Sequence, residues 1–215
     1  MGESRVIILF DLDGTLIDST EAILESFHNS FDFYGVSHPS DEAIEALIGY
    51  PLDVMYRELG TEEEKIWDYV ATYKEHYRKI STQKTVLLEC AREAVELANE
   101  FATLAVVTTK TGKYSRVLLE HFDLMEAFKV LIGREDVEKP KPDAEPILNA
   151  LKELDLKDEE IWMIGDTKLD LLSAKNAGVN SIGVLSGYDK REVLEKFTDF
   201  IFEDALEAVV YLQSR

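Results

Sequence analysis

The chain has 215 residues, of which 46% are hydrophobic and 31% charged, and its formal net charge is −20 at pH 7. These values are typical of a globular protein with a sizeable core, and the length suits one domain with a large insertion or two small domains. The negative charge argues against nucleic acid or an anionic membrane surface as a partner, because both would repel the protein at long range. A small anionic substrate is still compatible with this charge, since a few local cations and hydrogen-bond donors can hold it.

The expected location is the cytoplasm. No apolar stretch has the length of a membrane span, and the first residues lack the pattern of a signal peptide. The single cysteine, Cys90, excludes an internal disulfide, in keeping with a reducing compartment. The sequence leaves open whether the protein is a monomer or a homodimer.

The first predicted element is a strand over residues 6–10, a short apolar run that is β-branched at three positions. Asp11 and Asp13 follow at its carboxyl end, the edge at which open α/β sheets bind ligands. Gly14 suits a tight turn whose N–H groups can face an anion. Two acids that share a pocket repel each other, so we predict a cation beside them. The alternative is a simple Asx turn with no ligand.

Residues 17–82 are predicted to be helical, because apolar side chains recur at spacings of three and four. The expected helices cover residues 20–34, 41–48, 52–59 and 62–80. A helical block that directly follows an acidic turn indicates a cap over that turn. Gly49 and Tyr50 interrupt the block, and together with Tyr56 they are our candidates for a substrate-selecting surface. An ordinary corner between two helices is the alternative.

After residue 82, predicted strands and helices alternate. The strands cover residues 103–108, 130–132, 161–164, 181–185 and 200–202. The helices cover residues 87–100, 113–121, 143–153, 169–177 and 204–213. Such alternation implies βαβ units and a parallel sheet. We therefore predict an α/β protein with a Rossmann-like doubly wound core, residues 1–16 and 83–215, and an inserted α-helical cap domain, residues 17–82.

Polar side chains follow two of these later segments. Thr108 and Thr109 end the strand over 103–108, where their hydroxyls either cap the next helix or bind a ligand. Lys139 and Lys141 alternate with two prolines that keep the backbone extended before a helix. Lysines in a loop are usually solvated, but a compact ammonium with three donors also suits phosphate binding.

A further pair of acids, Asp166 and Asp170, follows the strand over 161–164. Asp170 would lie in the first turn of a helix, where carboxylates are favoured by the helix dipole, so helix capping is one interpretation. Metal binding is the other, because Mg²⁺ prefers oxygen ligands and typically takes one or two carboxylates plus the substrate phosphate.

Four segments together resemble, in order, the motifs of the haloacid dehalogenase-like hydrolase superfamily. They are D-L-D-G-T at residues 11–15, the threonine at 108, K-P-K-P at 139–142 and G-D-T-K-L-D at 165–170. The resemblance covers nearly the whole chain. It is closest to phosphatases with a small helical cap, and among these to phosphoglycolate phosphatases.

This resemblance implies a role for each matching residue. Asp11 corresponds to the nucleophile that accepts the phosphoryl group, and Asp13 to the acid and base. Thr108 corresponds to the residue that hydrogen-bonds the phosphoryl group, with Thr109 beside it where many relatives have asparagine. In the K-P-x-P motif Lys139 corresponds to the lysine that neutralises the charges of nucleophile and phosphate, and the second lysine fills the variable position.

The resemblance also implies a magnesium site. Asp11, Asp166 and the backbone carbonyl of Asp13 would hold Mg²⁺, with Asp170 bound directly or through water. Asp11, Asp13, Asp166 and Asp170 are thus the expected metal residues.

The expected function is a Mg²⁺-dependent phosphomonoester hydrolase that forms an aspartyl-phosphate on a small phosphorylated metabolite, with phosphoglycolate as one candidate. A sugar-phosphate mutase similar to β-phosphoglucomutase is the nearest rival. Such mutases have a histidine shortly after the first motif, whereas the first histidine here is His28. A non-catalytic phosphate-binding or phosphoacceptor regulatory protein is a rival from another class, but phosphoacceptor domains are shorter and lack an inserted cap.

Overall fold

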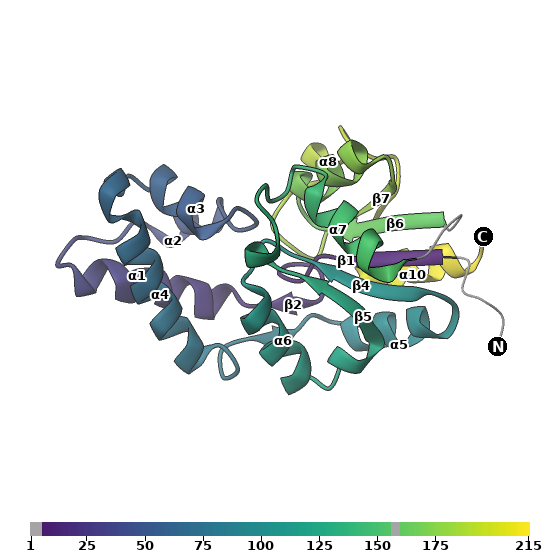
Figure 1. Ribbon diagram of the computed structural model, residues 1–215, viewed down its shortest axis with the longest axis horizontal. Coiled ribbons are helices and arrows are strands. Elements are labelled where there is room, and N and C mark those ends of the chain that lie inside the picture. Colours follow the sequence, from purple (N-terminus) through teal and green to yellow (C-terminus); the bar gives the residue numbers. More distant parts are fainter. Residues whose placement is uncertain (1–5, 156–159) are drawn as a thin grey trace. The chain divides into compact units, whose positions relative to one another are not determined.

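The computed structural model describes residues 6–155 and 160–215, which form two compact units (Figure 1). Met1–Asp18 and Leu87–Arg215 make up one, here called the core unit, and Ser19–Val86 make up the other, the helical unit. Residues 1–5 and 156–159 of the predicted core lie outside the described residues. No helix in the described parts of the chain is long and apolar enough to cross a membrane.

The core unit is built on a six-stranded parallel sheet with the order β5-β4-β1-β6-β7-β8. Its strands are β1 (Val6–Phe10), β4 (Thr103–Val107), β5 (Phe128–Ile132), β6 (Glu160–Gly165), β7 (Asn180–Val184) and β8 (Ile201–Phe202). The chain runs outward from the centre in both directions, as in a doubly wound fold, so the predicted Rossmann-like α/β class is confirmed. The direction changes around β1, which is where such folds bind ligands.

Helices cover both faces of this sheet (Figure 1). They are α5 (Ala91–Phe101), α6 (Gly112–His121), α7 (Glu145–Leu154), α8 (Lys168–Ala177), α9 (Arg191–Leu194) and α10 (Ala205–Gln213), with single turns η2 (Met125–Ala127) and η3 (Arg134–Asp136). Side chains alternate along β1, so Ile8 and Phe10 pack with α5 and α10, while Ile7 and Leu9 pack with α7 and α8. This alternation explains why the whole strand is apolar.

The register of the sheet sets the position of the polar residues that follow the strands. Phe10 in β1 is level with Val106 in β4 and with Ile164 in β6. Because the three strands are parallel and end at nearly the same level, the residues after them meet at one edge of the sheet.

The helical unit contains α1 (Thr20–Phe33), α2 (Asp41–Glu45), α3 (Leu52–Glu58), the single turn η1 (Glu63–Lys65) and α4 (Ile66–Ile80). Its interior is aromatic: the ring of Phe27 lies 4.6 Å from that of Tyr56 and 5.0 Å from that of Tyr73. The predicted helices are all present, although the one expected over 62–80 begins with the separate turn η1.

Two short strands, β2 (Ile17–Asp18) and β3 (Val86–Leu87), form a separate two-stranded sheet that the sequence did not predict. Two residues are too few to produce a recognisable alternation. One boundary between the units falls at the end of β2, after Asp18, and the other within β3, after Val86.

Candidate active site

The turn after β1 brings Asp11 to the edge of the sheet. The N–H of Asp11 donates to the carbonyl of Ile164 at 2.9 Å, which extends the β1–β6 ladder by one bond. The turn that follows is tight, with the N–H groups of Leu16 and Ile17 both donating to the carbonyl of Leu12. Gly14 has a φ of +81°, and a Cβ there would overlap the side chain of Asp166. Glycine is therefore required here for both conformation and space.

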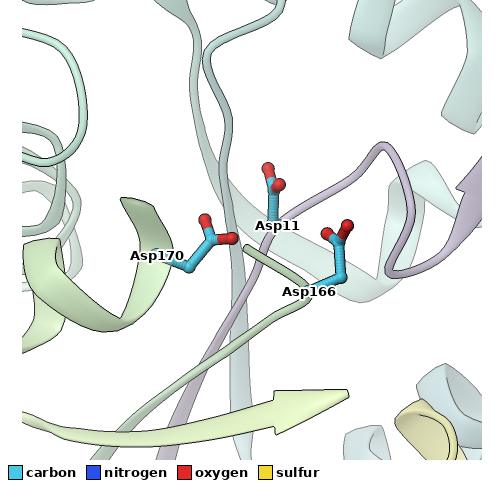
Figure 2. A group of neighbouring side chains, drawn as sticks. All are labelled: Asp11, Asp166 and Asp170. Carbon is cyan, nitrogen blue, oxygen red and sulfur yellow. The ribbon is translucent and has the colours of Figure 1, made fainter. Parts of the chain in front are cut away.

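Three carboxylates meet at this edge. Asp11, Asp166 and Asp170 each offer an oxygen within 4.8 Å of the others, and all three residues are buried. Figure 2 shows Asp11 and Asp166 side by side just after β1 and β6, with their carboxylates pointing the same way, and Asp170 at the start of α8 with its carboxylate pointing toward Asp11. Burial and the charge of Asp170 raise the pKa of Asp11 to about 7, and burial raises the pKa of Asp166 well above its usual value. Buried like charges held this close to one another indicate a place for a cation.

The donor set fits a divalent cation that prefers oxygen. Asp11 Oδ1 is buried and accepts no well-aligned hydrogen bond from the described residues. The oxygens of Asp166 accept from the Thr15 hydroxyl at 3.0 Å and from the Tyr188 N–H at 2.9 Å. Each carboxylate oxygen has two lone pairs, so these bonds leave acceptor capacity for a metal.

Asp170 is engaged on both oxygens. Oδ2 accepts from the N–H and the hydroxyl of Thr167, at 3.0 and 2.7 Å, which caps α8. Oδ1 accepts from Lys141 Nζ at 2.5 Å. A Cβ on Gly165 would overlap the Asp170 side chain, so the end of β6 also requires glycine. Asp170 thus both caps the helix and belongs to the acid cluster.

The lysine beside the expected nucleophile is Lys141 and not Lys139, so the sequence-based assignment was wrong. Lys141 is buried, and its Nζ lies 2.9 Å from Asp11 Oδ1 and 3.1 Å from the carbonyl of Val107. Burial alone would lower the pKa of Lys141, but the charges of Asp11 and Asp170 raise it above its ordinary value. The lysine is therefore charged at neutral pH.

The repeat in Lys-Pro-Lys-Pro caused this error. Two lysines with the same local sequence, two residues apart, can each be aligned with the lysine of the family motif. Lys139 is exposed, and its N–H donates to Glu145 Oε2 at 3.0 Å. The N–H of Glu138 donates to the other oxygen of Glu145. The first turn of α7 therefore holds the start of the segment at the surface, and the second lysine reaches the edge of the sheet. Only the position of α7 shows which of the two lysines reaches the acid cluster.

Thr108 and Thr109 follow β4 at the same edge. The N–H of Thr108 donates to the carbonyl of Ile132 at 3.0 Å, and its hydroxyl oxygen accepts from the N–H of Lys110 at 3.1 Å. Thr108 is buried and Thr109 is half-buried. As an acceptor in that bond, the hydroxyl of Thr108 keeps its own proton to donate.

The second acid of the β1 turn, Asp13, has a different environment. Its carboxylate is not part of the acid cluster found among the described residues. Instead both of its oxygens accept hydrogen bonds from Lys110 Nζ, at 3.0 and 2.9 Å. The sequence analysis gave Lys110 no role. A lysine directly after a buried strand, at the edge where the neighbouring strand ends in acids, was the available signal.

The loop after β7 completes the surroundings of Asp166. Besides the Tyr188 N–H, the hydroxyl of Ser186 donates to the carbonyl of Gly14 at 2.8 Å. A Cβ on Gly187 would overlap Asp166. Ser186, Gly187 and Tyr188 carry no motif signal of their own, whereas Thr15 is the last residue of the D-L-D-G-T segment. These contacts depend on the packing of one strand end against the next.

In the helical unit, Tyr56 does not fit the expected substrate-selecting surface. It is fully buried, its hydroxyl lies 2.5 Å from Ser30 Oγ, and burial raises its pKa far above the usual value. Tyr56 faces α1 and α4, so it is part of the aromatic core. Gly49, with a φ of +104°, and Tyr50 are half-buried in the turn before α3, and they stay candidates.

The fold and this arrangement of acids and lysine agree with a comparison against protein families. Residues 8–184 match the model of the haloacid dehalogenase-like hydrolase family. The chain belongs to this family, as the motifs indicated.

Among known proteins, the chain is similar to pyrophosphatases PpaX. It is 38% identical over 176 residues to the PpaX of Halalkalibacterium halodurans, which covers 81% of this chain and 80% of that protein. Among solved structures it is similar to a haloacid dehalogenase-like hydrolase from Streptococcus pneumoniae, with a TM-score of 0.86, 27% identity and coverage of 96% and 98%.

A protein from Haemophilus somnus described as a predicted phosphoglycolate phosphatase has the same fold, with a TM-score of 0.88 at 23% identity over 99% and 100% of the two chains. Together the family and the relatives show that this chain is a phosphatase.

Proposed function

We propose that the chain is a Mg²⁺-dependent phosphohydrolase that forms an aspartyl-phosphate on Asp11 and acts on a small phosphorylated metabolite. One observation carries this proposal: Asp11 lies at the strand end between two further buried acids and Lys141. The acids suit a cation, and the cation and Lys141 suit a phosphoryl group. Phosphoryl transfer needs such positioning and charge neutralisation above all.

In the first step an oxygen of Asp11 forms a bond to phosphorus, and the bond from phosphorus to the leaving oxygen breaks. The electron pair stays with the leaving group, and Asp13 protonates this oxygen if it leaves as an alkoxide. Lys141, the hydroxyl of Thr108 and the N–H groups of Leu12 and Thr109 donate to the phosphoryl oxygens.

In the second step water attacks the same phosphorus, and Asp13 takes the proton from the water. The bond between phosphorus and Asp11 breaks, inorganic phosphate leaves, and the carboxylate of Asp11 is restored.

Mg²⁺ would be held by Asp11, Asp166 and the backbone carbonyl of Asp13, where it would offset the negative charge of the acids and of the phosphate. Asp170 Oδ2 accepts two hydrogen bonds from Thr167, and Oδ1 is paired with the ammonium of Lys141, so we propose that Asp170 contacts the metal through water. Asp170 then acts mainly by holding Lys141 in place.

Pyrophosphate is the first substrate that we propose, because two relatives that are 38% and 32% identical to this chain are named pyrophosphatases. Phosphoglycolate is the second, on the resemblance of the motifs to phosphoglycolate phosphatases. We further propose that the helical unit acts as the cap and that Gly49 and Tyr50 contribute to substrate selection. We also propose that the protein binds neither nucleic acid nor a membrane surface.

The test measures phosphate release from both substrates with Mg²⁺ and with a chelator. Wild-type protein should release many phosphates per chain with Mg²⁺, and Asp11→Asn should lower kcat by more than about 1,000-fold while the circular dichroism spectrum is unchanged. Peptide mass spectrometry after an acid quench should find the phosphate on Asp11. Substantial turnover by Asp11→Asn would contradict the proposal. Transfer of phosphate to a second sugar phosphate, without release, would indicate a mutase.

A further inference from the structure

The ion pair between Lys110 and Asp13 has no role in the mechanism described so far. The two side chains are only 9% and 13% exposed, and the ammonium donates to both carboxylate oxygens. The backbone of Lys110 is fixed on both sides, because its N–H donates to the Thr108 hydroxyl and its carbonyl accepts from the N–H of Arg134 at 3.0 Å. The backbone that carries the Lys110 side chain is therefore held in place at the edge of the sheet.

The site thus holds two lysines with different partners. Lys141 pairs with Asp11 and Asp170, on the side of the attacking oxygen. Lys110 pairs with Asp13, which in the proposed mechanism faces the leaving oxygen. Partly buried ion pairs cost desolvation and stabilise a fold little, so a second lysine at this place suggests a role in the reaction.

The chemistry of the leaving group supplies such a role. A leaving group with its own negative charge has to approach the carboxylate of Asp13, which repels it. An ammonium beside Asp13 offsets this repulsion and can share its donors between the carboxylate and the anion. A leaving group without charge gains nothing from it.

We propose that Lys110 determines specificity for leaving groups that carry negative charge, such as the second phosphate of a diphosphate or the carboxylate of a short phosphorylated acid. This inference rests on the proposed function, and it narrows the substrate class of the same site. It assigns Lys110 to the leaving group and Lys141 to the transferred phosphoryl group.

With a diphosphate, an oxygen of Asp11 bonds to one phosphorus and the bridging P–O bond breaks. The electron pair stays on the oxygen of the departing phosphate, which leaves as an anion beside Lys110 and needs no proton from Asp13. With a short phosphorylated acid, Asp13 reacts in its protonated form. The leaving oxygen takes this proton, and Lys110 is released to donate to the carboxylate of the substrate. With a neutral alkyl phosphate, only the proton transfer applies.

The start of α6, two residues after Lys110, is not an equivalent anion site. The N–H groups of Gly112 and Lys113 donate to the two oxygens of Glu135, at 2.8 and 3.2 Å. An acid of the protein itself therefore already occupies this helix end. On this part of the edge, an anion would meet the side chain of Lys110.

The test compares Lys110→Met with Lys113→Met, a matched control in which an exposed lysine of the same segment loses its charge. The substrates are pyrophosphate, phosphoglycolate and ethyl phosphate, each with saturating Mg²⁺. Lys110→Met should lower kcat/KM for the first two by about 100-fold and for ethyl phosphate by less than about 5-fold. Lys113→Met should change none of them, and Lys110→Arg should restore most of the preference.

Equal losses on all three substrates would mean that Lys110 only holds Asp13, and no loss would mean that it has no role; either result overturns the inference. Binding of pyrophosphate to Asp11→Asn, with and without Lys110→Met, gives a second readout without turnover, and we expect about 10-fold weaker binding. If wild-type protein hydrolyses none of the substrates, the proposed function fails. The binding comparison then still reports on Lys110 separately.

Discussion

The core unit and the helical unit use charge in opposite ways. In the core unit the ion pair of Lys141 with Asp11 is almost fully buried, with side chains 2% and 5% exposed. In the helical unit the pair of Arg57 with Glu63 is 44% and 66% exposed, and the interior is aromatic. Exposed pairs contribute about 0–1 kcal/mol, and buried ones often cost stability compared with apolar side chains. The buried charges of the core unit are therefore expected for a ligand-binding site, and the aromatic interior of the helical unit for a hydrophobic core.

The largest difference in kcat is expected between substitutions of the two lysines in the K-P-K-P segment. Lys141→Met should lower kcat by roughly 100-fold to 1,000-fold, because it removes the cation beside Asp11 and the ammonium that pairs with Asp170 Oδ1. Lys139→Met should change kcat by less than about 2-fold, since this side chain is exposed. Steady-state kinetics on pyrophosphate measure both. The reverse order of effects would restore the assignment made from the sequence.

Substitution of Tyr56 tests the other side of the comparison. Tyr56→Ala should lower the free energy of unfolding by about 3–5 kcal/mol, as for other large buried aromatic residues. Tyr56→Phe should cost about 1 kcal/mol, because only the hydrogen bond with Ser30 is lost, and Ser30 Oγ also donates to the carbonyl of Phe27. Urea unfolding followed by circular dichroism measures both values.

The same Tyr56→Phe variant separates a packing role from a substrate-selecting role. If Tyr56 only packs, the ratio of kcat/KM for pyrophosphate and phosphoglycolate should equal that of the wild-type protein. A changed ratio of kcat/KM with an unchanged free energy of unfolding would show that Tyr56 contributes to substrate selection.

The smallest effect concerns the pH dependence of stability without metal. Because the folded state raises the pKa of Asp11 from 3.8 to about 7, folded protein keeps a proton that unfolded protein releases in this range. The contribution of Asp11 to stability is thus present below pH 4 and is lost as the pH rises toward 7. Melting temperatures in a chelator should fall more steeply over this range for wild type than for Asp11→Asn.

Mg²⁺ should reverse this loss in the wild-type protein at pH 7, since a ligand that binds only the folded state stabilises it. A melting temperature of wild-type protein that Mg²⁺ leaves unchanged would contradict a metal site at Asp11, Asp166 and Asp170. Asp166→Asn is the matched variant, and its response to Mg²⁺ should be weaker.

The sequence by itself determined the fold class, because apolar runs and helical spacings are local patterns that repeat along the chain. It also indicated that Asp11, Asp13 and Asp166 follow buried strands, and parallel strands place such residues at one edge. The resemblance to the family motifs implied a metal site of Asp11, Asp13, Asp166 and Asp170, of which the structure brings the carboxylates of Asp11, Asp166 and Asp170 together. Local patterns are sufficient to place residues at a sheet edge, and the motifs are needed to assign them a role.

Only the tertiary structure decided which of two neighbouring candidates faces the site. Lys139 and Lys141 have the same local sequence, and the start of α7 selects between them. Tyr56 lies on a helix whose apolar face the sequence showed, but its partners on α1 and α4 show that it is buried. Lys110 and Asp13 are 97 positions apart, and the register of β1 with β4 brings them together. Contacts between distant segments depend on packing, which no local pattern contains.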